Sequence, residues 1–366
     1  KDILKSDSLT AQYLNYKLEI PIPKQRRKTR NYIEILGARS HNLKNIDVKI
    51  PLNCLAVITG VSGSGKSTLV RHILYPVLQK ELTGYSTDKI GQYRNIEGNY
   101  ESLKNVEFIN QNPIGRSSRS NPVTYIKAYD DIRNLFASQK LSKIRNYKSK
   151  HFSFNVDGGR CETCKGDGEV TIEMQFMADV HLICETCNGK RFKKEVLEVT
   201  FEGKSISDLL TLSVDESILF FKEINQLKVV QKLKALQDVG LGYVQLGQAS
   251  STLSGGEAQR IKLASFLVKG VTKEKTLFIF DEPTTGLHFH DILKLIKSFQ
   301  ALIEKGHSVL VIEHNLDLIK CADYIIDLGK EGGEKGGDLL FQGTPEDLIL
   351  QQNSYTASYL SEKLKV

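Results

Sequence analysis

The chain has 366 residues and a net charge of +7, and at about 150 residues per domain it is long enough for two or three domains. Hydrophobic residues make up 40% and charged residues 25%, close to the averages of globular proteins, which excludes a disordered or low-complexity chain. No apolar run approaches the roughly 18 residues of a membrane-spanning helix and no signal peptide opens the chain, so we expect a soluble cytoplasmic protein.

Residues 1–31 are predicted to be a lead-in to the first domain. A short helix is expected between residues 8 and 16, and Pro21 and Pro23 prevent it from continuing. A basic run then spans residues 24–30. Such a run is either a solvated linker or a contact to phosphate groups, and the sequence favours neither interpretation.

Residues 32–110 are predicted to form the first part of an ATP-binding domain. Short strands are expected at 32–36 and 46–50, and the apolar, β-branched run 55–59 predicts a buried strand. This strand leads into Gly60–Ser67, which fits the phosphate-binding pattern G-x-x-x-x-G-K-[ST] at every fixed position. A helical apolar pattern follows, and strand, glycine-rich loop and helix in this order are the context that the pattern requires.

The glycine-rich loop predicts a site for ATP or ADP with Mg²⁺. Its glycines let backbone N–H groups turn toward the phosphates, and the N-terminus of the following helix adds the positive end of its dipole. Lys66 is expected to reach the β- and γ-phosphates, and the Ser67 hydroxyl is expected to bind Mg²⁺. The residues predicted to contact the nucleotide here are Gly60, Val61, Ser62, Gly63, Ser64, Gly65, Lys66, Ser67 and Thr68.

Residues 111–250 are predicted to be an inserted signature domain with a metal module at about 155–195. Two Cys-x-x-Cys pairs have the spacing of a four-cysteine zinc site: Cys161, Cys164, Cys184 and Cys187. Four protein ligands leave no open coordination position, so the zinc is predicted to be structural, and a redox role for the pairs is the competing interpretation. Cys54 and Cys321 stand alone and are predicted to be buried small hydrophobic residues.

Basic and aromatic residues lie close to the cysteine pairs in the sequence. The basic residues are Arg116, Arg119, Lys140, Lys143, Arg145, Lys148, Lys150, Lys190, Arg191, Lys193 and Lys194, and the aromatic residues are Tyr147, Phe152, Phe154 and Phe192. The combination suits backbone contact plus stacking on exposed nucleic-acid bases. The alternative is a solvated basic surface with the aromatic rings packed around a small zinc core, and composition does not decide between the two.

Residues 251–366 return to an α/β pattern and are predicted to complete the ATP-binding domain. A helix is expected from Gly255 to about Lys269 and another near 291–305, with strands at 276–280 and 308–312. One α/β domain is therefore predicted to be interrupted by a large insertion.

Polar residues at the ends of these last elements have predicted roles in nucleotide chemistry. Asp281 ends an apolar strand and is expected beside Mg²⁺, while Glu282 orients or deprotonates the attacking water. His314 follows the next strand and is expected at the γ-phosphate. A Ser-Gly-Gly turn opens the first helix as an anion-binding end, and is predicted to bind the γ-phosphate of a nucleotide held by another P-loop through Ser254, Gly255, Gly256 and Glu257.

The P-loop, Leu253–Glu257, Phe280–Glu282 and His314 together resemble an ABC-type ATPase. The resemblance implies that two heads sandwich ATP, each site pairing the P-loop of one head with the signature loop of the other. It also implies that Gln111 is the Q-loop glutamine, so that the catalytic set is Lys66, Gln111, Glu282 and His314. The predicted fold class is an α/β ABC-type P-loop ATPase head interrupted by a largely helical signature domain that carries the four-cysteine zinc module.

The zinc insertion makes the chain similar to protein A of the bacterial UvrABC excinuclease, in its carboxyl-terminal half. The stretches that carry this similarity are Gly37–Arg39, Asn42–Ile46, Pro113–Arg116, Arg119–Pro122, Phe152–Asn155, Gly240–Tyr243 and Asp281–His288. The similarity implies a damage-recognition ATPase of nucleotide excision repair, not itself a nuclease. The implied partners are double-stranded DNA, especially damaged DNA, protein B of the excinuclease and a second ABC head. The chain has one P-loop and one signature loop, so it is expected to be a separated half or a paralogue.

Two other classes of function remain open at this point. One is the ATPase head of a transporter, against which the lack of a membrane segment and the zinc insertion both argue. The other is a zinc-bearing ABC-type ATPase that acts as a protein-interaction or assembly module without lesion recognition. A protein of this second class is expected to bind other proteins and not DNA.

Overall fold

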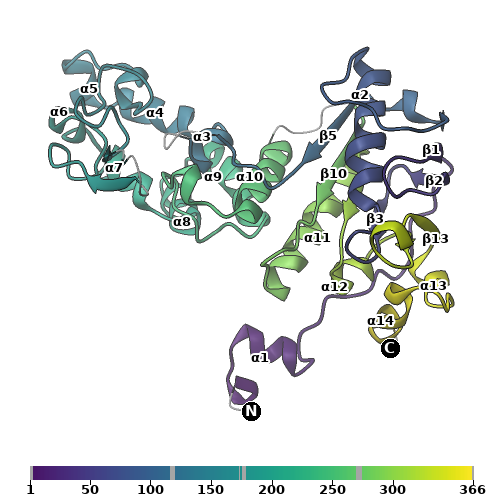
Figure 1. The fold of residues 1–366 in the computed structure, drawn as a ribbon. Coiled ribbons are helices and arrows are strands. Elements are labelled where there is room, and N and C mark those ends of the chain that lie inside the picture. The colour runs from purple at the N-terminus through teal and green to yellow at the C-terminus, as the bar shows by residue number, and fades with distance from the viewer. Residues whose placement is uncertain (1–2, 116–119, 173, 175–178, 269–273, 365–366) are drawn as a thin grey trace. The chain divides into compact units, whose positions relative to one another are not determined.

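The structure is a computed structural model, and it describes residues 3–115, 120–172, 174, 179–268 and 274–364. The described residues divide into two compact units (Figure 1). The first unit combines the residues up to Gln111 with those from Gly270 onward, and the second unit is the continuous stretch between them.

The first unit is built on a six-stranded sheet with the order β13-β12-β3-β11-β10-β5. All neighbouring pairs are parallel except β12 and β13, which are antiparallel. The central strands are buried along their length, as is usual for parallel strands covered on both faces. The strands are β3 (Leu55–Thr59), β5 (Asn105–Ile109), β10 (Thr276–Asp281), β11 (Ser308–Ile312), β12 (Tyr324–Gly329) and β13 (Asp338–Gly343).

A smaller antiparallel sheet, β2-β1-β4, shares its apolar core with the main sheet. Its strands are β1 (Tyr32–Ala38), β2 (Ile46–Pro51) and β4 (Asn95–Gly98). The α-helices of this unit are α1 (Leu9–Leu14), α2 (Tyr75–Thr83), α11 (Phe289–Glu304), α12 (Leu316–Ile319), α13 (Pro345–Leu348) and α14 (Tyr355–Leu364). Short 3₁₀ segments are η1 (Ile3–Lys5), η3 (Tyr100–Ser102) and η6 (Gly333–Lys335), and η2 (Thr68–Leu74) is a π-helix that runs into α2.

The parallel register brings three loops to one edge of the main sheet. Asp281 pairs with Ile312, and Ile312 pairs with Ile58 on the next strand. The residues after these positions therefore leave the sheet at its carboxyl edge, where ligands bind in open α/β sheets. The sheet order places the P-loop, which follows β3, beside the loops that follow β10 and β11.

The second unit is largely helical. Its helices are α3 (Pro122–Tyr125), α4 (Tyr129–Ala137), α5 (Lys140–Ile144), α6 (Lys194–Leu197), α7 (Ile206–Thr211), α8 (Val214–Glu223), α9 (Leu227–Asp238) and α10 (Gly255–Val268), with 3₁₀ turns η4 (Ser149–Phe152) and η5 (Ser250–Thr252). Two small antiparallel hairpins are β6 (Glu169–Ile172) with β7 (Val180–Ile183), and β8 (Thr200–Phe201) with β9 (Lys204–Ser205). Capping boxes at Ser205 and Ser213 begin α7 and α8.

The predicted fold class is confirmed: an α/β head is interrupted by a largely helical unit that carries four clustered cysteines. The helix expected after the P-loop opens as the π-helix η2, and the one expected near 291–305 begins earlier, at Phe289. Helix α10, expected with the second part of the ATP-binding domain, clusters with the second unit instead. Among the described residues, no helix combines the length and apolar character needed to cross a membrane.

Candidate nucleotide and zinc sites

The P-loop is closed around the Lys66 side chain. Lys66 is 5% exposed, and its ammonium group donates to the carbonyl oxygens of Gly60 at 2.9 Å and Val61 at 2.8 Å. Burial lowers the pKa of Lys66, while the carboxylates of Glu282, Asp327 and Asp281 act in the opposite direction. The Lys66 ammonium group is therefore held within the loop by neutral carbonyl acceptors. A charged phosphate can replace these carbonyl oxygens as its hydrogen-bond partner.

Two glycines of the loop have conformations that side chains rarely adopt. Gly60 has a φ of +132°, and an added Cβ would lie 2.0 Å from the carbonyl oxygen of Leu328. Gly65 has a φ of +106°, and its Cβ would lie 2.7 Å from Leu43 Cδ2. At both ends of the loop the neighbouring residues Leu328 and Leu43 therefore leave no room for a side chain. Between the two glycines, the buried Ser64 Oγ has no hydrogen-bond partner within the described chain, which fits a loop completed by a polar ligand.

The loop is also supported by residues outside it. Asn42 Nδ2 donates to the carbonyl oxygens of Gly63 at 2.8 Å and Gly333 at 3.0 Å. The Gly333 amide in turn donates to Gly63 at 3.0 Å. Asn42 and η6 therefore together hold the Gly63 carbonyl oxygen of the P-loop in place.

Glu282 and His314 meet at the carboxyl edge of the sheet. His314 Nε2 lies 3.4 Å from Glu282 Oε1, and both side chains are about half exposed. Burial and the nearby Lys66 ammonium lower the pKa of His314, which favours its neutral ring, while the Glu282 and Glu313 carboxylates act in the opposite direction. Gln111 joins them from the end of β5, because its Nε2 donates to the Glu282 carbonyl oxygen at 3.3 Å. The predicted catalytic residues of the first unit are thus brought together.

Asp281 lies beside this group at the last position of β10. Burial raises its pKa, the cations Arg71 and Lys66 oppose that rise, and the neighbouring Glu282 adds to it. A half-buried carboxylate next to like charges is the kind of ligand whose ionised form a divalent cation stabilises.

Glu313 is a residue of this site that the sequence did not point to. It is 3% exposed, and its Oε1 accepts hydrogen bonds from the Thr284 amide at 2.9 Å and the Thr284 hydroxyl at 2.5 Å. Its Oε2 accepts from the amides of His314 at 2.7 Å and Asn315 at 2.9 Å. One buried carboxylate therefore ties the loop after β10 to the loop after β11. An acidic residue directly after a fully apolar strand was the signal available.

The substitution Glu313→Gln is expected to destabilise the first unit. Glutamine keeps the shape, but its NH₂ group faces amide donors where only an acceptor fits, and leaving them unpaired costs about 1–3 kcal/mol. Chemical denaturation should show this loss in the free energy of unfolding. Glu101→Gln, the same change at an exposed position in η3, is the control and should be nearly neutral. If the two variants were equally stable, the conclusion that Glu313 holds the two loops together would be contradicted.

The signature loop lies in the second unit and opens helix α10 through a capping box. The Ser254 amide donates to Glu257 Oε2 at 2.7 Å, and the Glu257 amide donates back to Ser254 Oγ at 3.2 Å. The Tyr243 hydroxyl donates to the other Glu257 oxygen at 2.5 Å. Burial raises the pKa of Glu257, but these hydrogen bonds outweigh it and hold the pKa below its usual value. Glu257 therefore shapes the turn that carries Gly255 and Gly256.

The four predicted metal ligands form one buried cluster. Their Sγ atoms all lie within 4.8 Å of one another. The Cys161–Cys184 sulfurs are 3.9 Å apart and the Cys164–Cys187 sulfurs 3.6 Å apart. A disulfide needs about 2.05 Å, whereas a tetrahedral zinc with bonds of about 2.3 Å places its sulfurs about 3.8 Å apart. The distances and the all-thiolate donor set therefore fit a closed structural zinc site.

Amide donors around the cysteines act against burial: burial prevails and raises the pKa of Cys164 and Cys187, whereas at Cys184 the amides prevail. The Gly168 amide donates to Cys164 Sγ at 3.2 Å. Burial raises the pKa of Cys184, but hydrogen bonds from the amides of Cys187 and Thr186 outweigh it and lower the pKa to about 7. Such turns around sulfur are typical of zinc knuckles. The lone Cys54 and Cys321 are both buried, as expected.

Three of the four aromatic residues near the cysteines are core residues, and the fourth, Tyr147, is partly buried. Phe152, Phe154 and Phe192 are at most 1% exposed, which excludes stacking of these three rings on nucleic-acid bases and favours the packed core. Their rings pack against one another and against Tyr129 and Phe136. The zinc site is small, and these rings supply the apolar core that it lacks.

Part of the basic set is likewise used within the unit. The Arg191 guanidinium lies over the Phe154 ring and donates to the Gly247 carbonyl oxygen at 3.0 Å. Arg145 pairs with Glu198, and Lys193 pairs with Glu162. Arg116 and Arg119 lie outside the described residues. The basic residues that remain exposed on this unit include Lys140, Lys143, Lys148, Lys150, Lys190 and Lys194.

Comparison with known proteins finds relatives along nearly the whole chain. It is 54% identical over 359 residues to UvrABC system protein A of Clostridium acetobutylicum and to that of Aquifex aeolicus. Each alignment covers 98% of this chain and 38% of the relative, so the chain spans well under half the length of the curated relatives it matches. The crystal structure of UvrA2 from Deinococcus radiodurans superposes with a TM-score of 0.90 and 40% identity, covering 100% of this chain and 43% of that one. No protein-family model matches the chain.

Proposed function

We propose that this chain is the carboxyl-terminal, ATP-hydrolysing part of a protein that recognises DNA damage in nucleotide excision repair. The premise is that nearly the whole of this chain resembles part of UvrABC system protein A. The single observation that supports it most is the meeting of Glu282, His314 and Gln111 at the sheet edge that also carries the P-loop. That arrangement pairs a carboxylate that can act on water with groups that can hold a γ-phosphate.

In the proposed reaction, Lys66 leaves its carbonyl acceptors and binds the β- and γ-phosphates. Glu282 accepts a hydrogen bond from the attacking water and takes its proton, while the neutral His314 donates to the γ-phosphate. Ser67 and Asp281 would hold Mg²⁺, which supplies positive charge to the phosphate oxygens. Water thereby forms the new bond to the γ-phosphorus as the bond to the β-phosphate oxygen breaks.

We further propose that the signature loop serves a second nucleotide. Ser254, Gly255 and Gly256 lie at the N-terminus of a helix of 14 residues, which is a site for anions. In a sandwich of two heads this turn would contact the γ-phosphate bound to the other head's P-loop. Hydrolysis then separates the two heads, and this cycle would let the protein scan duplex DNA, load protein B of the excinuclease at a lesion and leave.

The proposed contact with DNA is through phosphates and not through stacked bases. The exposed lysines of the second unit suit this contact, because such binding is electrostatic and falls steeply with salt. The zinc is proposed to fold the module that presents them.

A triple variant, Lys150→Ala with Lys190→Ala and Lys194→Ala, is expected to weaken duplex binding about tenfold at low salt. The slope of log affinity against log salt concentration should become shallower by about 0.9 for each phosphate that the variant no longer neutralises. Fluorescence anisotropy across a salt series measures both quantities. Lys222→Ala on α8, outside the zinc module, is the control. An unchanged slope in the triple variant would exclude these lysines from the DNA interface.

The proposed function as a whole is tested by duplexes with and without one bulky lesion, with zinc and ATP present. Preferential binding to the damaged duplex supports damage recognition by this chain. Equal, salt-sensitive binding keeps the DNA role and assigns discrimination to another part of the protein or to the dimer. No binding even at low salt contradicts the proposal and favours a zinc-bearing ATPase that assembles with proteins only.

A further inference from the structure

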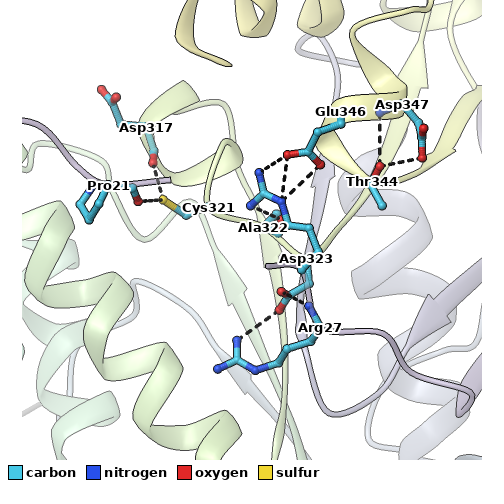
Figure 2. Close-up of polar contacts among 10 residues, drawn as sticks. Pro21, Arg27, Asp317, Cys321, Ala322, Asp323, Thr344, Glu346 and Asp347 are labelled. Carbon is cyan, nitrogen blue, oxygen red and sulfur yellow. Dashed lines mark hydrogen bonds and ion pairs between the residues drawn. The ribbon is translucent and has the colours of Figure 1, made fainter. Parts of the chain in front are cut away.

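Residues 9–27, called here the N-terminal strap, are fastened along the first unit. Arg26 donates to the Ala322 carbonyl oxygen at 2.9 Å and forms an ion pair with Glu346 at 2.7 Å. Figure 2 shows the neighbouring contact, in which the Arg27 amide donates to Asp323 Oδ1 at 2.8 Å. Asp323 is buried and also accepts from the Leu55 amide at the start of β3.

These contacts show the role of two arginines of the basic run at residues 24–30. The Arg26 side chain is only 10% exposed, and the Arg27 guanidinium approaches Asp323 Oδ2 at 3.4 Å. Further along the strap, Cys321 Sγ donates to the Pro21 carbonyl oxygen at 3.5 Å (Figure 2). Arg26 and Arg27 therefore anchor the strap to the protein, whereas Lys24, Lys28 and Arg30 of the same run are exposed.

The other end of the strap, helix α1, packs against the start of α11. The Tyr13 ring is buried, stacks on Phe289 with a centroid distance of 5.5 Å, and meets the His288 ring edge-on at 5.8 Å. Thr10 Oγ1 lies 3.1 Å from His288 Nε2. Two residues on one face of α1 thus hold the His288 ring from two sides.

His288 is the N-cap of α11, and its hydrogen bonds define its state. Its Nδ1 accepts from the His290 amide at 3.2 Å, so this nitrogen carries no proton. In the neutral ring the proton is then on Nε2, which donates to Thr10 Oγ1. The contact with Thr10 is compatible with this tautomer, because a hydroxyl oxygen can accept a hydrogen bond from Nε2.

His288 also ends the loop that begins with Glu282. The near end of this loop is held by Glu313 through Thr284 and by the Thr285 hydroxyl, which donates to the Glu282 carbonyl oxygen at 3.0 Å. The Glu282 backbone itself has a φ of +46°, a conformation that a side chain adopts only when its surroundings enforce it. At the far end of this loop the His288 ring caps α11, and the N-terminal strap contacts that ring through Thr10 and Tyr13.

We propose that Thr10 and Tyr13 are positioning residues for ATP hydrolysis: by holding His288 they fix the far end of the loop that carries Glu282. This inference rests on the proposed function of Glu282. Because misplacing a catalytic group by a fraction of an ångström slows the chemistry more than it weakens substrate binding, the strap is expected to act on kcat and not on KM.

The test uses Thr10→Val and Tyr13→Ala in the full chain. Each is expected to lower kcat for ATP about fivefold with KM within twofold of the parent. Leu9→Ala, an exposed apolar residue on the same helix, is the control and should match the parent. Parent-like kcat in both variants would overturn the proposal, as would an equal loss in the control.

A coupling experiment separates positioning through His288 from general destabilisation. His288→Asn keeps a good N-cap residue but is too short to reach both strap residues. If the strap acts through His288, adding Tyr13→Ala to His288→Asn lowers kcat no further. Additive losses in the double variant would show that Tyr13 acts by another route and would overturn the proposal.

Hydrogen exchange gives a readout that does not depend on turnover. The amides of Asp291 and Ile292 donate to the His288 carbonyl oxygen at 2.9 and 3.1 Å. In Tyr13→Ala they are expected to exchange at least threefold faster, with β10 amides unchanged. Unchanged or uniformly faster exchange overturns the inference. If the parent instead shows no turnover that depends on Glu282, the proposed function fails, while the exchange still reports whether the strap holds the loop.

Discussion

Replacing Glu282 with Gln is expected to reduce ATP turnover by about 10²–10⁴-fold, the range typical for loss of a general base. Glutamine keeps the side-chain length and can still accept a hydrogen bond from His314, but it cannot take a proton from water. The loop itself should persist, because its supports are the Glu282 backbone and the neighbouring threonines. Nucleotide affinity is therefore expected to stay within about threefold of the parent.

The measurement is steady-state phosphate release together with binding of a fluorescent ATP analogue. Glu304→Gln, an exposed position at the end of α11, removes the same charge away from the site and is the matched control. Turnover equal to the parent would remove Glu282 from the chemistry. Loss of nucleotide binding together with turnover would instead make the residue a binding group, and the proposed role would also be wrong.

Removing the zinc is expected to unfold the segment around the four cysteines while the first unit stays folded. Structural zinc sites bind their metal with about 10–16 kcal/mol, and this free energy is what folds the surrounding chain. The hairpin β6–β7 between the cysteine pairs is exposed along both strands, so it adds little apolar burial of its own. Rapid proteolysis within 155–195 and weaker duplex binding should follow from chelation.

Cys161→Ser should reproduce chelation, with loss of bound zinc measured by elemental analysis. Cys321→Ala changes a buried cysteine in the other unit and should retain the metal. Nucleotide binding should survive in both, because the P-loop lies in a separate compact unit. Full protection from protease after chelation, with normal DNA binding, would show that the metal has no folding role there.

The sequence predicted what depends on short-range pattern. The P-loop could be found because glycine is required where φ is positive, as at Gly60 and Gly65, and the strand before it is uniformly apolar. The cysteine cluster could be found because two-residue spacing within each pair is a local property of metal knuckles. These patterns need no knowledge of the rest of the fold.

What could not be predicted depends on contacts between residues far apart in the chain. The local sequence does not show what Glu313 contacts, because its partner Thr284 is brought beside it only by the pairing of β10 with β11. Phe152 and Phe154 look the same in sequence whether they face solvent or a core, and burial was decided by Tyr129 and Phe136. The strap likewise takes its partners from residues some 300 positions away, such as Asp323.

The strand order of the main sheet has a consequence for how the chain is synthesised. Strand β3 is made early, yet its two neighbours, β11 and β12, come from beyond residue 307. On the ribosome, β3 therefore waits with both edges unpaired while the whole second unit is translated, and unpaired strand edges invite aggregation. The second unit is continuous in sequence and can fold during that interval. The part of the molecule that carries the P-loop is thus the last to become complete.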